Sequence, residues 1–229
     1  YLKLIKDELI DIKDDGSFLI NQKYFDYSTG LKMTSKKFED LFNIKRKNPE
    51  DKIEQIHMDI AASIQKIIED IIITMCNDLH AKYKIDNICL AGGVALNCVA
   101  NGKLINKTPF KKIWIQPASS DSGGSLGGAL SYWYMGLKNK RNIYPEDAMK
   151  GSYLGPEYSN EQIENELKEI GAIYETLDTK EIIKLASLDL SKGKCLGWFQ
   201  DRMEFGPRAL GNRSILADPR NLQMQETLN

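Results

Sequence analysis

The sequence predicts an α/β fold, and three patterns along the chain support this. Isoleucines recur at three- and four-residue steps across residues 50–83, which indicates one long amphipathic helix. Two short apolar segments, 88–91 and 112–116, have the length of buried strands, and each runs into a glycine-containing turn and then a helical pattern. Strand, glycine turn and helix in this order are how α/β folds present backbone N–H groups to a nucleotide.

The first third of the chain is mixed. Residues 16–21 predict a short strand, and Pro49 and Asp51 supply start signals for the long helix. His57 and His80 lie too far apart on that helix to bind one ligand together. We therefore expect each histidine to be a surface or packing residue.

Gly92 and Gly93 follow the strand at 88–91, and the predicted helix after them contains Asn97 and Asn101. Glycine allows the backbone to approach a ligand closely, so the pair is compatible with a nucleotide-binding turn. A tight strand-to-helix connection explains two adjacent glycines equally well. The double glycine is weak support for a site when it is taken alone.

Asp121 follows the strand at 112–116, at the strand end where open α/β sheets place their active sites. A carboxylate there is a candidate metal ligand or general base. The alternative is a helix N-cap, because Asp accepts backbone N–H bonds at that position. Glycines within 123–128 leave one face of the next helix bare, either for close packing or for a ligand.

Glycines and prolines between 136 and 156 mark a boundary, which divides the chain into residues 1–148 and 149–229. The second part is predicted to contain both helices and strands. Its expected elements are a helix over 159–170, a strand over 172–176, a helix over 179–191 capped by Thr179, and a strand over 196–199. The apolar residues on the expected buried side of the second helix are Ile182, Ile183, Leu185, Ala186 and Leu190.

Four arginines, Arg202, Arg208, Arg213 and Arg220, follow the last strand among glycines and prolines. Each guanidinium offers a planar fork of donors that fits a phosphate or a carboxylate. The run therefore predicts a pocket for a phosphate or another oxyanion. The alternative is a structural ion-pair network with neighbouring acids. Those acids are Asp201, Glu204 and Asp218.

The composition is that of a globular protein, with 229 residues of which 42% are hydrophobic and 28% charged. A formal net charge of -1 gives no basic field for nucleic acid, so the arginines are a local feature. The longest apolar run, 67–75, contains two acids and is too short to span a membrane. The four cysteines lack metal-ligand spacing and predict reduced, buried thiols of a cytoplasmic protein. The N-terminus is no signal peptide and lacks an initiator Met, so we expect a fragment.

Three separated motifs carry a resemblance to a known family. They are residues 90–97 (LAGGVALN), 116–129 (QPASSDSGGSLGGA) and 198–214 (WFQDRMEFGPRALGNRS). Together they resemble the O-carbamoyltransferase family, which includes the nodulation protein NodU and the antibiotic carbamoyltransferases. The resemblance covers nearly the whole chain, and the third motif is the most specific.

The resemblance implies a fold. Residues 1–148 are expected to form the second half of an actin-like (RNase H-like) ATPase domain, and residues 149–229 the start of a YrdC-like α/β domain. Members of the family are much longer, so the remaining parts of both domains are expected outside this chain. We expect the isolated fragment to be inactive.

The resemblance also implies a reaction. ATP and carbamoyl phosphate give carbamoyl-adenylate and pyrophosphate, and the carbamoyl group then passes to a hydroxyl of a sugar-like or natural-product acceptor. The expected partners are these small molecules, with no nucleic acid and no membrane, and an oligomer is left open. The alternatives are an actin-fold sugar kinase, which would need a phosphate-binding Asp-x-Gly hairpin at the start of its ATPase domain, and a non-catalytic nucleotide-binding module.

Matching the motifs residue by residue implies roles for the candidate site. Gly92, Gly93 and Asn97 correspond to the lining of the adenylate site. Asp121 corresponds to a ligand of an iron-type divalent metal, whose two histidine ligands belong to a His-x-x-x-His helix expected before this chain.

The same matching implies roles for the arginines. Arg202 corresponds best to an arginine that holds carbamoyl phosphate, and Arg208 and Arg213 are candidates for the same pocket or its walls. Arg202 and Asp121 are thus the expected catalytic residues. Fixed guanidinium donors would stabilise the charge of two phosphate-bearing substrates without having to reorganise.

Overall fold

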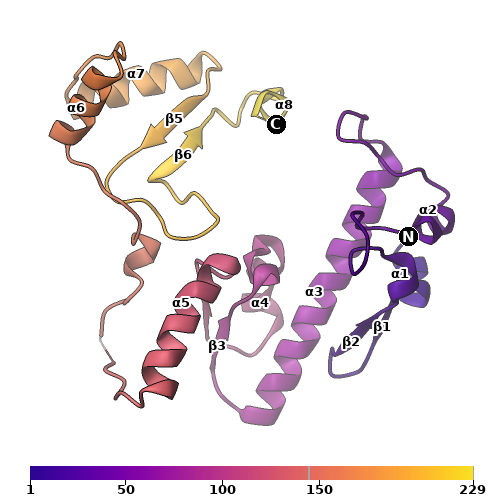
Figure 1. The fold of residues 1–229 in the computed structure, drawn as a ribbon. Helices are drawn as coiled ribbons and strands as arrows, with labels where there is room; N and C mark the ends of the chain where they lie inside the picture. Colours follow the sequence, from indigo (N-terminus) through magenta and orange to yellow (C-terminus); the bar gives the residue numbers. More distant parts are fainter. Residues whose placement is uncertain (144, 229) are drawn as a thin grey trace. The chain divides into compact units, whose positions relative to one another are not determined.

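The computed structural model describes residues 1–143 and 145–228 (Figure 1). Its helices and short strands form a mixed α/β protein, as predicted. Contacts along the backbone divide it into two compact units. The first comprises Tyr1–Leu90 and Asn97–Trp114, and the second comprises Ala91–Leu96 and Ile115–Asn229. In the described ranges, no helix is long and apolar enough to cross a membrane.

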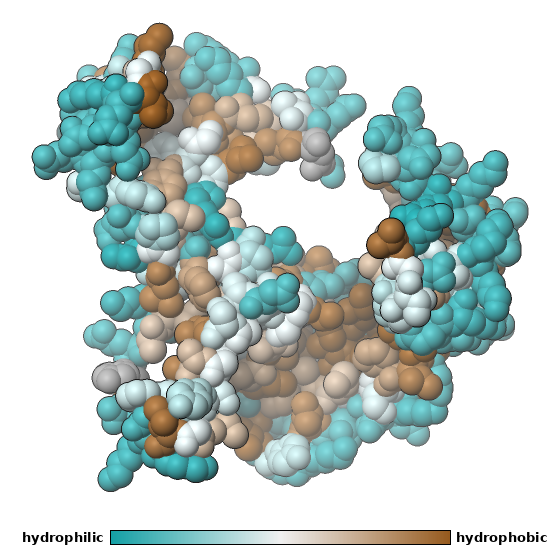
Figure 2. All heavy atoms as spheres, viewed as in Figure 1, coloured by the Kyte–Doolittle hydropathy of each residue, from teal (hydrophilic) through white to brown (hydrophobic). Residues whose placement is uncertain are grey.

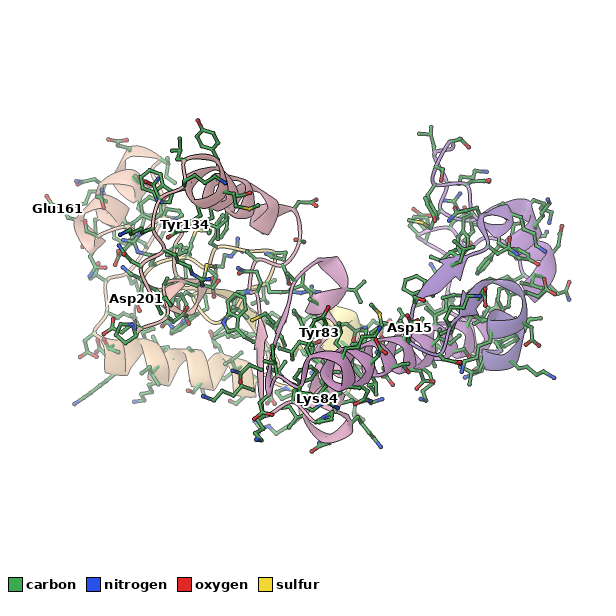
Figure 3. The ribbon with its side chains drawn as sticks, turned by 90° about the horizontal axis from the view of Figure 1, so that it is seen from below. Asp15, Tyr83, Lys84, Tyr134, Glu161 and Asp201 are labelled. Atoms are coloured by element: carbon green, nitrogen blue, oxygen red, sulfur yellow. The ribbon has the colours of Figure 1, made fainter. Side chains whose placement is uncertain are left out.

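The first unit is built on α3 (Gln55–Tyr83), the long helix that the isoleucine spacing predicts. It begins later than the start signals indicated. Nδ1 of His57 accepts the N–H of Glu54 at 3.0 Å and closes the first helical turn, whereas Asp51 accepts the N–H of Asn48 at 2.8 Å in the preceding turn. The helix ends at Lys84, which has a left-handed φ of 55° (Figure 3).

The other elements of this unit pack around α3. They are α1 (Leu2–Glu8), β1 (Ile10–Ile12), β2 (Phe18–Ile20), η1 (Gln22–Tyr24), α2 (Lys36–Phe42), β3 (Asn87–Leu90), α4 (Cys98–Lys107) and β4 (Lys112–Ile115). Strands β1 and β2 are antiparallel, and β3 pairs with β4. The strands expected within 16–21, 88–91 and 112–116 are thus confirmed.

The apolar face of α3 contributes to two hydrophobic clusters. The first consists of Ile5, Leu9, Tyr24, Phe42, Ile60, Ile67 and Ile71. The second consists of Cys76, Leu104 and Phe110. The ring of His80 meets Phe110 edge-on, with 5.3 Å between the ring centroids. The predicted packing role of this histidine is therefore confirmed.

The second unit contains several helices and one pair of strands. Its elements are η2 (Gly93–Leu96), α5 (Asp121–Ser131), η3 (Tyr132–Gly136), η4 (Lys150–Ser152), α6 (Asn160–Glu169), α7 (Thr179–Ser191), β5 (Leu196–Phe199), β6 (Arg213–Leu216) and α8 (Met224–Leu228). Strands β5 and β6 are antiparallel, from Leu196 opposite Leu216 to Phe199 opposite Arg213. The part of the arginine run that lies between them, residues 200–212, therefore returns on itself as a loop.

Three expectations for this unit are wrong. Residues 172–176 form no strand, because no strand among the described residues pairs with them. Asp178 rather than Thr179 caps α7, since its carboxylate accepts the N–H of Glu181 at 2.9 Å. Ile182, Ile183 and Leu185 of α7 are exposed rather than buried. Other apolar side chains also reach the surface around α6 and α7 (Figure 2).

The four cysteines are free thiols, but only Cys76 is buried. Burial raises the pKa of the Cys76 thiol. Cys89 is exposed because it alternates along β3 with Ile88 and Leu90, whose side chains pack on the second cluster. Cys98 and Cys195 are exposed too, so the expectation of buried thiols is wrong for three of the four.

Candidate functional site

Residues 200–212, between β5 and β6, form a closed loop that carries Arg202 and Arg208, and we call it the arginine loop. At its neck, the Gln200 N–H donates to the Asn212 carbonyl at 3.0 Å, and the Gln200 side chain donates to Asn212 Oδ1 at 3.2 Å. The Asn212 side chain in turn donates to the Arg202 carbonyl at 2.9 Å. Asp201 leaves β5 with a left-handed φ of 48° (Figure 3). These bonds join both ends of the run, so it is a structured segment and not a free connection.

Glu204 lies inside this loop with a side chain that is 0% exposed. Oε1 accepts the N–H of Leu210 at 2.7 Å and that of Asn212 at 2.8 Å, and Oε2 lies 3.5 Å from Nε of Arg213. Burial raises the pKa of Glu204, but the backbone N–H donors and the charge of Arg213 outweigh burial and set this pKa below its ordinary value. The carboxylate is therefore ionised, and the loop folds around it.

Two other segments of the second unit hold the loop from outside. The buried hydroxyl of Ser152 donates to the Phe205 carbonyl at 2.9 Å, and the Phe205 N–H donates to the Ser152 carbonyl at 2.6 Å. Gly206 lies against Pro117 so closely that a Cβ on Gly206 would stand 2.9 Å from the Pro117 carbonyl oxygen. Pro117 belongs to the turn that leads to Asp121. The structure therefore brings the arginine loop and the Asp121 turn together.

Two of the arginines belong to the ion-pair network that was the alternative to a ligand pocket. Arg213 pairs with Glu204 and also donates to the Gly206 carbonyl. Arg220 pairs with Asp218 at 2.6 Å, and its hydrogen bonds lower the pKa of Asp218 to about 2. These two guanidinium groups therefore have internal partners.

Arg202 and Arg208 are exposed. Arg202 donates to the Gly155 carbonyl at 2.9 Å and pairs with Glu157 at 2.6 Å, in an ion pair whose side chains are 46% and 51% exposed. Such an exposed pair contributes little stability, so an anion can replace Glu157 at small cost. Arg208 makes no side-chain hydrogen bond or ion pair with any residue that the structure describes. Its guanidinium donors face solvent.

Asp121 is the first residue of α5, and Ser120 occupies the N-cap position. The glycines of this helix differ in their surroundings. Gly123 packs against the carbonyl of Ala118, where no side chain would fit, whereas the other glycines of α5 have open space where a Cβ would stand. The bare face expected from the sequence is therefore present. Close packing accounts for Gly123, and the rest of the face leaves room beside the helix.

Gly92 has a left-handed φ of 95°, and both Gly92 and Gly93 have open space around the place of a Cβ. Asn97 caps α4 and does not lie within it, because its Oδ1 accepts the N–H of Ala100 at 3.1 Å. The Asn97 side chain also donates to Gln65 at 2.9 Å. This side chain thus has a structural task, and its contact with a nucleotide stays a prediction.

A polar cluster on α3 is not among the features predicted from the sequence. Gln65 donates to one carboxylate oxygen of Glu69 at 3.0 Å, and Lys103 of α4 donates to the other at 2.5 Å. Glu69 is buried, and the hydrogen bonds from Lys103 and then Gln65 set its pKa below the ordinary value. A signal was present, because Gln65 and Glu69 stand four residues apart within the isoleucine pattern, where apolar residues are expected.

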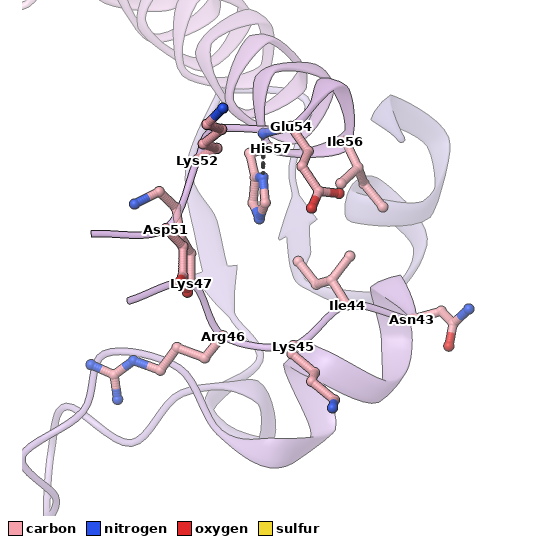
Figure 4. A pocket seen from close by; sticks show the side chains of 10 residues that line it. All are labelled: Asn43, Ile44, Lys45, Arg46, Lys47, Asp51, Lys52, Glu54, Ile56 and His57. Atoms are coloured by element: carbon pink, nitrogen blue, oxygen red, sulfur yellow. Dashed lines mark hydrogen bonds between the residues drawn. The ribbon is translucent and has the colours of Figure 1, made fainter. Parts of the chain in front are cut away.

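A polar pocket of about 520 Å³ lies at the start of α3 (Figure 4). It is lined by Asn43, Ile44, Lys45, Arg46, Lys47, Asp51, Lys52, Glu54, Ile56 and His57. In Figure 4 the ring of His57 is held by the Glu54 N–H that closes the helix. This pocket shares no residue with the predicted site.

Comparison with known families gives a match at both ends of the chain. A sequence model of the carbamoyltransferase N-terminus matches residues 2–130, and one of the carbamoyltransferase C-terminus matches residues 187–229. The chain belongs to the carbamoyltransferase family. The N-terminal match contains Asp121 and the double glycine, and the C-terminal match contains the arginine loop.

The chain is also similar to individual proteins. The uncharacterized protein sll1178 of Synechocystis sp. is 51% identical over 100% of this chain. Nodulation protein NolO of Bradyrhizobium diazoefficiens is 39% identical over 76% of it, and Nodulation protein U of the same organism is 29% identical over 81%. The chain spans 38%, 31% and 29% of the lengths of these three relatives.

The described residues of this carbamoyltransferase chain include no cluster of metal ligands. Across residues 1–143 and 145–228, no three side chains of His, Cys, Asp or Glu gather so that they could hold an ion. Asp121 offers one carboxylate, while His57 is bound to Glu54 and His80 packs on Phe110. A metal at Asp121 stays a prediction, with its two histidine ligands expected before this chain.

Proposed function

We propose that the chain is part of an O-carbamoyltransferase that forms carbamoyl-adenylate from ATP and carbamoyl phosphate and passes the carbamoyl group to a hydroxyl of a sugar-like or natural-product acceptor. Family membership supports carbamoyl transfer and favours it over a sugar kinase or a non-catalytic nucleotide-binding module. As part of the proposal, residues 1–148 belong to an actin-like ATPase domain and residues 149–229 to a YrdC-like domain.

The proposed reaction proceeds through carbamate and carbamoyl-adenylate. Water first releases phosphate from carbamoyl phosphate, which leaves carbamate. A carbamate oxygen then attacks the α-phosphorus of ATP, and pyrophosphate departs. In the last step the acceptor oxygen attacks the carbamoyl carbon and loses its proton, and AMP departs. Carbamoyl phosphate, carbamate, ATP and carbamoyl-adenylate are all anions, so the site needs fixed positive charge.

The observation that carries the proposal is the free guanidinium of Arg208 on a rigid loop beside the Asp121 turn. A planar fork of donors binds a phosphate or carbamate in a bidentate way. Arg202 lies on the same loop and adds a second fork when the anion displaces Glu157 from its exposed ion pair. Arg213 forms a wall of the site, since its guanidinium is already bound within the loop.

Gly92 and Gly93 are the proposed backbone contacts of the nucleotide. The open space beside both residues allows a substrate to reach the main chain, which a side chain would obstruct. Asn97 contributes indirectly, because its bonds to Ala100 and Gln65 fix the end of the segment that carries the two glycines.

Isotope exchange tests this proposal in the full gene product that carries residues 1–229. We expect labelled pyrophosphate to enter ATP only when carbamoyl phosphate is present. Arg208→Ala should lower the rate of exchange about 100-fold, the usual effect of removing a fixed donor to an anionic transition state. Arg202→Ala should also lower the rate, because it removes the second fork.

Arg220→Ala is the matched control, because this exposed arginine is paired with Asp218 outside the loop. Its exchange rate should equal that of the unsubstituted protein. Exchange that does not depend on carbamoyl phosphate would refute the proposed function. Residues 1–229 alone should show no exchange and no stoichiometric iron.

A further inference from the structure

Glu204 is a buried acid in the middle of a loop that is proposed to bind anions. Its charge would repel a phosphate, and neither of its oxygens reaches solvent. An ionised carboxylate is stable in such a place only when it is hydrogen-bonded and paired. Glu204 therefore acts on the protein and not on the ligand.

The contacts of Glu204 close the loop. One oxygen accepts the N–H groups of both Leu210 and Asn212, so residues 205–209 form a ring whose two ends meet at this carboxylate. Arg208 lies within that ring. Gly206, two residues before Arg208, is seated on Pro117. The backbone of Arg208 is thus held in place relative to the Asp121 turn.

Glu204 also determines which arginine is free. Its second oxygen faces Nε of Arg213, and Nη2 of Arg213 donates a hydrogen bond to the Gly206 carbonyl. The acid inside the loop is therefore paired with Arg213 and not with Arg208. One carboxylate thereby shapes the loop and leaves one guanidinium available.

We infer that Glu204 is a positioning residue of the carbamoyl-phosphate site, which holds the loop so that Arg208 meets the anion. The inference rests on the proposed function. Glu204→Gln removes the charge and leaves a single acceptor oxygen. Glu204→Asp keeps the charge but shortens the side chain, so it separates loop geometry from charge and carries the same test if the Gln variant does not fold.

The first measurement is the exchange reaction in the full gene product. Both variants should raise the apparent KM for carbamoyl phosphate about tenfold, in line with the loss of a hydrogen bond to a charged group, and leave the KM for ATP unchanged. Because Glu204 acts through Arg208, adding Glu204→Gln to Arg208→Ala should produce no further change. Asp218→Asn removes an acid that pairs outside the loop and should leave both constants unaltered.

A second measurement does not depend on catalysis. Phenylglyoxal modifies accessible arginines, and mass spectrometry identifies Arg208. Carbamoyl phosphate should protect Arg208, and half-protection of the Glu204→Gln protein should need about tenfold more of it. Additive effects of the two substitutions on KM, or equal protection of variant and unsubstituted protein, would overturn the inference. Absence of exchange from the unsubstituted protein would instead overturn the proposed function, and the protection assay would still decide the role of Glu204.

Discussion

Gly206→Ala should weaken the attachment of the arginine loop to the Asp121 turn. Gly206 has a φ of 140°, which L-residues rarely adopt, and its Cβ would stand 2.9 Å from the Pro117 carbonyl oxygen and 3.4 Å from the Cα of Ala118. Backbone strain of this kind costs about 1–3 kcal/mol. Forced movement of packed atoms adds about 1–3 kcal/mol, because the clash is with main chain that cannot rotate away. The free energy of unfolding of the second unit should therefore fall by about 2–6 kcal/mol.

Urea unfolding measures this loss. Trp198 of β5 reports on the second unit once Trp114 and Trp133 have been replaced by Phe. Gly211→Ala is the matched control, since this glycine of the same loop has a φ of 121° but nothing within 4 Å of the added Cβ. Gly211→Ala should lower the free energy of unfolding only by the cost of the backbone strain, about 1–3 kcal/mol. Equal losses at the two positions, or no loss at Gly206, would refute the packing of the loop on Pro117.

Three further predictions concern the core and the buried acids. Leu104→Ala should cost about 2–5 kcal/mol of unfolding free energy, because Leu104 is 0% exposed, whereas the 69% exposed Ile105 should tolerate Ala with no measurable change in urea unfolding. Lys103→Ala should cost about 1–3 kcal/mol by leaving the buried Glu69 without its cation, and adding Glu69→Gln should recover part of that loss in the same assay; a further loss would contradict the pairing. Because the folded-state pKa of Glu204 lies below its ordinary value of 4.5, its stabilising contribution is fully present above pH 4.5 and is lost as the pH falls through the folded value. Thermal unfolding of Glu204→Gln between pH 3 and pH 6 should therefore depend less on pH than that of the unsubstituted protein, and parallel profiles would contradict this.

Local signals predicted most of the elements correctly. The long helix follows from the isoleucine spacing. Helix α6 follows from Ser159, whose side chain accepts the N–H of Gln162 and whose own N–H donates to the Gln162 side-chain oxygen. The strand expected over 172–176 failed because a strand exists only with a partner, which local sequence does not provide. Apolar spacing on α7 predicted a helix correctly, but it did not determine whether that face is covered.

In the candidate site, too, the sequence predicts residue types, and only the fold shows their partners. The types and order of its residues predicted an anion site in the arginine run and a carboxylate at the start of α5. They could not assign the arginines individually, because the partners of a guanidinium are chosen in three dimensions. Arg202 pairs with Glu157, 45 residues away, and Lys103 reaches Glu69 across 34 residues.

The sequence by itself determined the α/β class, most helices and strands, and the family to which the chain belongs, since these depend on local periodicity and on motifs. The tertiary structure alone decided that Arg213 is bound by Glu204 while Arg208 stays free, and that Gly206 seats the loop on the Asp121 turn. The physical reason is that burial and pairing depend on which groups share a volume. The folding of the chain determines which groups share a volume, whereas composition and residue spacing do not.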